Sequence, residues 1–66
     1  MLSARNQFKG VVKSVKLGGV MAEVIIAVGD LEFVSAITRS SAETLGLKAG
    51  DEVKAVIKST EVLIDK

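Results

Sequence analysis

The 66-residue chain has no cysteine, histidine, tyrosine or tryptophan, and it has two phenylalanines. Without cysteine no disulfide can form, and without cysteine or histidine we expect no zinc site and no other bare metal cation. Histidine, cysteine and tyrosine commonly serve as general bases or nucleophiles, so without them a serine nucleophile would have only lysine or a carboxylate to activate it. No glycine-rich phosphate loop or paired-carboxylate motif stands out. The composition therefore predicts a protein that is not an enzyme.

No apolar stretch reaches the length of a membrane-spanning helix, and no secretory signal is present. The formal net charge is +1, so no overall field would draw the chain to nucleic acid. Four basic residues precede the first acid, Glu23: Arg5, Lys9, Lys13 and Lys16. The lysines among them are typical of a solvated strand face. We expect a soluble, cytoplasmic protein with no membrane partner.

Apolar runs that fit the two-residue period of a strand, one of them alternating with lysines, predict five strands. They cover residues 8–17, 20–28, 31–38, 52–58 and 62–64. Gly10 interrupts the first alternation, and a glycine kink of this kind lets one long strand serve two sheets at a barrel corner. The glycine-containing pairs at 18–19 and 29–30 fit tight turns between the first three strands.

A short helix is expected between the third and fourth strands. Ser40 followed by Glu43 has the pattern of a capping box, and Gly46 suits the residue after the helix. The order is then three strands, a helix and two strands, as in an OB-type barrel. We predict an all-β fold, a five-stranded OB-like barrel with one short helix between strands 3 and 4, in a single domain over residues 1–66.

Small aliphatic side chains dominate the apolar content, which is 48% of the chain. A core built from them in so short a chain is small, and small domains without disulfides or zinc can gain stability by oligomerisation. Residues 20–28 are apolar on both faces of the expected strand except at Glu23, which is typical of a strand covered on both sides. We therefore expect a homo-oligomer with an apolar interface.

Two polar segments far apart in the sequence carry donors for an anion. The first is Ser3-Ala4-Arg5-Asn6-Gln7, and the second is Lys58-Ser59-Thr60. Arg5 and Lys58 together would balance a dianion, while hydroxyl and backbone N–H groups would bind its oxygens. A site made only of donors suits an anion with no proton left to give, such as sulfate, molybdate or tungstate.

Thr38 and Ser41 lie at the expected start of the helix, where free backbone N–H groups also attract anions. The simpler alternatives are a solvated N-terminal tail and hydroxyls that only cap the helix. Another alternative is an OB-type nucleic-acid-binding module. Such a module stacks bases on aromatic side chains, for which only Phe8 and Phe33 are available, so we expect nucleic acid not to be a partner.

Several segments together carry a family resemblance: Ser3-Ala4-Arg5-Asn6-Gln7, Gly10, Gly19-Val20, Ala22-Glu23-Val24, Ile37-Thr38 with Ser41, Leu45-Gly46-Leu47 and Val56-Ile57-Lys58-Ser59-Thr60-Glu61-Val62. In these the sequence resembles the molbindin family, small cytoplasmic molybdate-binding proteins. The opening segment together with the Lys-Ser-Thr segment is the specific part of the match. The resemblance implies an OB-like barrel that assembles into a homohexamer, a trimer of dimers with strands exchanged between partners.

The same resemblance implies that molybdate or tungstate binds between subunits as a ligand. The residues that it implies at the site are Ser3, Ala4 (through its backbone), Arg5, Thr38, Ser41, Lys58 and Ser59. A chain that is nothing but the binding domain would hold the anion for intracellular storage and homeostasis. The alternative within the same chemistry is a sensor that passes its state to a partner protein.

Overall fold

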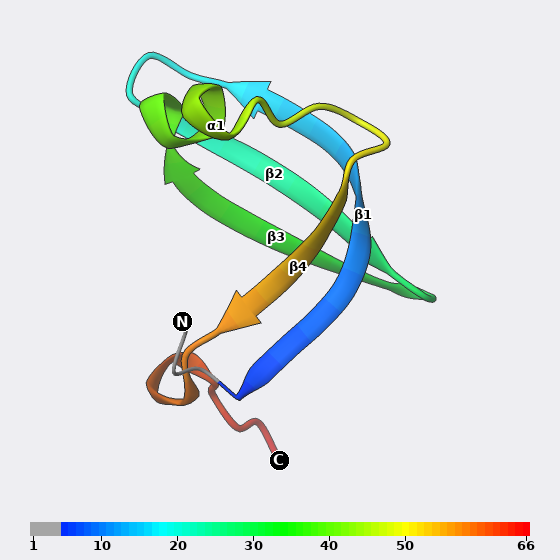
Figure 1. The fold of residues 1–66 in the computed structure, drawn as a ribbon. Helices are drawn as coiled ribbons and strands as arrows, with labels where there is room; N and C mark the ends of the chain where they lie inside the picture. Colours follow the sequence, from blue (N-terminus) through cyan, green and yellow to red (C-terminus); the bar gives the residue numbers. More distant parts are fainter. Residues whose placement is uncertain (1–4) are drawn as a thin grey trace.

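A computed structural model describes residues 5–66, so Ser3 and Ala4 of the predicted site lie outside the described part of the chain. The described residues form four strands, one α-helix and one 3-10 turn (Figure 1). In chain order these are β1 Asn6–Leu17, β2 Met21–Val28, β3 Leu31–Thr38, α1 Arg39–Leu45, β4 Glu52–Ile57 and η1 Ser59–Glu61. Neighbouring strands pair antiparallel in the sheet order β3-β2-β1-β4.

The long strand β1 pairs with two different strands. Its residues 6–11 form a ladder with β4, and its residues 11–17 form a ladder with β2. Gly10 lies close to the point where the two ladders meet, and a Cβ there would lie 2.5 Å from the backbone oxygen of Ala27. The register also shifts between Val12 and Ser14, which places a bulge in the strand. The long strand does change partner near Gly10, but the prediction that it serves two sheets is wrong for the single chain, because all four strands belong to one sheet.

Small aliphatic residues fill the inside of the curled sheet. The buried ones are Val12, Ala22, Val24, Ile26, Ala42 and Ala55. On β2 the buried residues alternate with more exposed ones, as the two-residue period of a strand requires. Among the described residues, the largest side chain that is fully buried is that of Val12.

The helix α1 begins earlier than the sequence predicted. Thr38, the last residue of β3, is the N-cap, and its Oγ1 accepts a hydrogen bond from the backbone N–H of Ser41 at 3.1 Å. The predicted capping box of Ser40 and Glu43 is wrong, because β3 runs directly into α1 and Ser40 is already helical. Gly46 ends the helix in the left-handed conformation, with φ 62°, as predicted. None of the helices in residues 5–66 is long and apolar enough to cross a membrane.

Residues 62–64 form no strand, so the described chain has four strands where the sequence predicted five. After η1 the backbone leads away from the sheet (Figure 1), and Leu63 and Ile64 are each 92% exposed. A strand needs a neighbouring strand to form hydrogen bonds with, and within residues 5–66 no strand pairs with residues 62–64. β3 and β4 are the outer strands, and the sheet of a single chain is open between them.

Candidate anion-binding site

The register of β1 and β4 brings the two polar segments of the sequence together. Asn6 and Ile57 are Cα partners, so the next residues outward along the two strands are Arg5 and Lys58. The start of β1 and the turn η1 lie at the same end of the molecule (Figure 1). Arg5, Lys58 and Ser59 are all exposed. One chain therefore places three of the predicted site residues at one end.

A single 3-10 turn shapes the segment after β4. Lys58 is its N-cap in an extended conformation, and the backbone N–H of Glu61 donates to the carbonyl oxygen of Lys58 at 2.9 Å. The N–H of Val62 reaches the carbonyl oxygen of Ser59 at 3.4 Å. The turn folds the chain back directly after Lys58, so Ser59 stays close to the end of the ladder.

Neither Arg5 nor Lys58 forms an ion pair with a carboxylate within residues 5–66. The ion pairs there join Lys13 to Glu32 and Arg39 to Glu43. Nor does any group of three or more metal-ligating side chains occur in that part of the chain. Two uncompensated positive charges on neighbouring strand ends suit a doubly charged anion and not a cation.

Thr38 and Ser41 lie at the other end of the molecule. Thr38 is the Cα partner of Met21, the first residue of β2, and α1 sits beside the turn that joins β1 to β2 (Figure 1). The 12 residues of β1 run between the two ends, and at about 3.3 Å per residue they span roughly 36 Å along the strand. A single chain therefore does not bring these hydroxyls to Arg5 and Lys58.

The two hydroxyls form a hydrogen-bonded pair. Thr38 Oγ1 donates to Ser41 Oγ at 2.7 Å while it accepts from the backbone N–H of Ser41. Each hydroxyl has one proton, so this contact uses one and leaves one for an outside acceptor. Thr38 is thus the helix cap, and the hydroxyl proton of Ser41 remains available to a ligand.

An open groove lies between β3 and β4 and ends beside Lys58. Its volume is about 650 Å³, which is far larger than a tetrahedral oxyanion. It is lined by Ile26, Phe33, Val34, Ser35, Ala36, Lys54, Ala55, Val56, Ile57, Lys58 and Glu61. This mostly apolar lining between two unpaired strand edges fits an extended chain segment and not a small anion.

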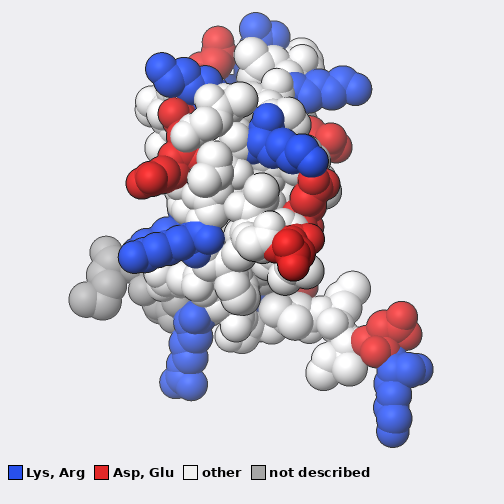
Figure 2. Space-filling view, turned by 90° about the vertical axis from the view of Figure 1, so that its right-hand side faces the viewer, with Lys and Arg blue, Asp and Glu red and all other residues white. Residues whose placement is uncertain are grey.

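The two phenylalanines do not provide a platform for stacking bases. Phe8 and Phe33 lie against each other, with ring centroids 5.2 Å apart and planes tilted by 52°. Phe33 is half-buried and Phe8 is 38% exposed. Figure 2 shows Lys and Arg interspersed with Asp and Glu on the face in view, without a continuous basic groove. Both observations disfavour the nucleic-acid alternative.

Arg39 lies beside Thr38 at the start of α1, and the sequence did not single it out. Its Nη1 donates to the carbonyl oxygen of Gly18 at 3.1 Å, and its Nε lies 3.5 Å from Glu43 Oε1. The spacing of Arg39 and Glu43 along a helix is visible in the sequence. The hydrogen bond to Gly18 cannot be read from the sequence, because it joins α1 to the turn between β1 and β2, and β2 and β3 lie between these two segments in the chain.

The sequence matches the TOBE domain family over residues 2–64. It is 52% identical over 64 residues to molybdenum-pterin-binding protein 3 of Clostridium pasteurianum, which covers 96% of this chain and 94% of that protein. The chain belongs to the molbindin family of TOBE-domain proteins. The resemblance found in the sequence is thereby confirmed.

Solved structures of molbindin relatives share the fold. A molybdate-binding protein from Sporomusa ovata superposes with a TM-score of 0.95 at 38% identity, covering 100% of this chain and 98% of that one. The cytoplasmic molybdate-binding protein ModG, solved with molybdate bound, superposes with a TM-score of 0.84 at 47% identity. That match covers 88% of this chain and 42% of the ModG chain, so this chain spans less than half of ModG.

Proposed function

We propose that this chain is a cytoplasmic binding protein for molybdate, with tungstate as a second ligand, and that it serves intracellular storage and homeostasis rather than catalysis. The observation that carries the proposal is the pair Arg5 and Lys58, set at adjacent strand ends, neither of which forms an ion pair within the described residues. Relatives that match nearly the whole chain support it, since they are named for binding molybdate or molybdenum-pterin. ModG, named as cytoplasmic, has the anion bound.

The proposed site combines two copies of the chain. One copy contributes Ser3, the backbone of Ala4, Arg5, Lys58 and Ser59, and a neighbouring copy contributes Thr38 and Ser41. Two copies are required because β1 separates these two groups within a single chain. Arg5 and Lys58 would balance the two negative charges, and the hydroxyls would donate to the oxygens.

The proposed assembly is a homohexamer, arranged as a trimer of dimers. Its support in the single chain is the amount of apolar surface left exposed, including Val20 at 76%, Val34 at 66% and the tail at residues 62–64. The outer strands β3 and β4 also leave unpaired edges beside the apolar groove. The tail of one copy, added at such an edge of another, would supply the fifth strand and close the barrel.

Calorimetric titration with molybdate, tungstate and sulfate tests this function. Molybdate and tungstate should bind tightly, and sulfate should bind much more weakly. Equal affinity for sulfate would reduce the proposal to general anion binding. Salt-sensitive binding of oligonucleotides at micromolar concentration, without binding of molybdate, would favour the OB-type nucleic-acid module instead.

A further inference from the structure

We infer that Arg39 is a positioning residue for the anion site, which fixes the hydroxyl pair of Thr38 and Ser41 by tying the start of α1 to the turn between β1 and β2. The inference rests on the proposed function, because it assigns Arg39 a part in holding the same anion. Arg39 itself need not touch the ligand. It acts through Thr38, the N-cap, and Ser41, which lies in the first turn of α1.

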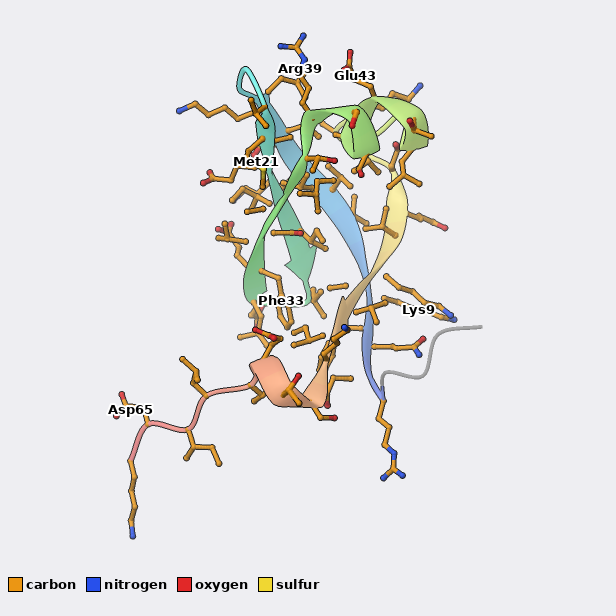
Figure 3. The ribbon with its side chains drawn as sticks, turned by 90° about the vertical axis from the view of Figure 1, so that its left-hand side faces the viewer. Lys9, Met21, Phe33, Arg39, Glu43 and Asp65 are labelled. Carbon is orange, nitrogen blue, oxygen red and sulfur yellow. The ribbon has the colours of Figure 1, made fainter. Side chains whose placement is uncertain are left out.

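Three contacts anchor Arg39. Its backbone N–H donates to the carbonyl oxygen of Val20 at 2.7 Å, and its Nη1 donates to the carbonyl oxygen of Gly18 at 3.1 Å. Its Nε lies 3.5 Å from Glu43 Oε1, one helical turn further along α1. Figure 3 shows Arg39 and Glu43 together at the helix end of the molecule. The guanidinium therefore joins the turn to the helix, which a side chain with a single donor group would do less well.

The helix has little else to hold its first turn in place. α1 has 7 residues, and Ala42 is its one buried residue. A helix this short is not stable in isolation, so its position depends on tertiary contacts. The turn is open at Gly19, where a Cβ would meet no atom within 4 Å, while the N–H of Gly18 donates to the carbonyl oxygen of Met21 at 2.7 Å. The bond from Arg39 therefore ties the short helix to the hydrogen-bonded end of the turn.

The position of the first turn decides where the free hydroxyl proton points. Thr38 Oγ1 is held between the N–H and the Oγ of Ser41, so the two side chains move as a unit with the start of α1. A loosened helix start would spread the Ser41 hydroxyl over several positions. The anion would then bind more weakly, because the protein would have to order this donor on binding.

The test compares Arg39→Lys, which keeps the charge but not the fork of donors, with Arg39→Met, which removes both. Calorimetry with molybdate should show both variants weakened by about three- to tenfold, the scale of one hydrogen bond. The loss should persist at high salt, where simple charge attraction is screened. NMR should show faster exchange of the Ser41 backbone amide with water in both variants.

Lys13→Met is the matched control, because it breaks the surface ion pair between Lys13 and Glu32 on β1 and β3. It should leave both the affinity and the Ser41 exchange rate unchanged. Wild-type affinity in Arg39→Lys would overturn the inference, and so would weaker binding with unchanged Ser41 exchange, which would mean that Arg39 contacts the anion directly. If the wild-type protein binds no molybdate, the proposed function fails. If it binds molybdate and the Arg39 variants bind equally well, only the inference fails.

Discussion

Asn6 and Ile57 are Cα partners at the outermost rung of the ladder between β1 and β4. This rung places Arg5 and Lys58 next to each other in space, although they lie near opposite ends of the sequence. In the proposed site a small anion would meet both positive charges on one copy of the chain. The remaining donors, at the start of α1, are separated from this point by the length of β1.

Arg5→Ala should weaken molybdate binding by more than about 1.5 kcal/mol, or more than roughly tenfold, because it removes a charged donor from the site. Arg5 precedes the first strand, so the fold should be unaffected. Calorimetry on the variant checks the prediction. Lys48→Ala, which removes one positive charge from an exposed loop position, is the control for net charge. An unchanged affinity in Arg5→Ala would remove the opening segment from the site.

Thr38→Ala should lower the free energy of unfolding by about 1 kcal/mol, because Thr38 is the N-cap of α1. Ser40→Ala should have almost no effect, since Ser40 lies inside the helix and caps nothing. Urea denaturation of the two variants measures the difference. An equal loss in both would restore the capping box that the sequence predicted.

Gly10→Ala should destabilise the fold by about 1–3 kcal/mol, the usual cost of forcing extra atoms into a packed site. The added Cβ would lie 2.5 Å from the backbone oxygen of Ala27, which cannot move without opening the ladder between β1 and β2. Gly19→Ala places the same methyl group in open space and serves as the control. Thermal unfolding should show a lower Tm for the first variant alone; equal values would mean that β1 does not need a glycine at its kink.

Leu63→Asp should break the assembly without unfolding the chain. Leu63 is 92% exposed in the single chain, so a charge there costs little in a monomer. In the proposed hexamer the same side chain would lie against a neighbouring copy, where an unpaired carboxylate is unfavourable. Analytical ultracentrifugation should find a large oligomer for the wild-type protein and smaller species for the variant. A wild-type protein that sediments as a stable monomer would contradict the proposed assembly.

Local patterns in the sequence predicted much of the fold. β1 alternates between apolar and polar residues, β2 is apolar on both faces except at Glu23, and the structure places β1, β2 and β3 within two residues of the expected bounds. Gly46 was predictable because a left-handed helix end favours glycine. Ser40 was chosen for the capping box, and capping by Thr38 was only an alternative, because both side chains can cap and the sequence does not show at which residue β3 ends.

The features that the sequence did not predict depend on contacts between distant segments. Residues 62–64 have strand-like composition, but a strand also needs a free edge, and the described chain does not place one beside them. The bond from Arg39 to Gly18 likewise exists only once α1 packs beside the turn. A joint anion site of Arg5 and Lys58 was expected from their chemistry alone and stays a prediction; the register of β1 and β4 places the two residues at the same end of the ladder.

Mixing two defective variants tests most directly whether the site is shared between copies. Arg5→Ala removes a charge at one end of the chain, and Ser41→Asp places a repelling carboxylate at the other end while remaining favourable in the first turn of a helix. Each variant alone should bind molybdate poorly. After the two are unfolded and refolded together, roughly one site in four should regain wild-type affinity by calorimetry, because a site built from two copies can draw its intact half from each. If the mixture binds no better than the separate variants, the anion is held within a single chain and the shared site is wrong.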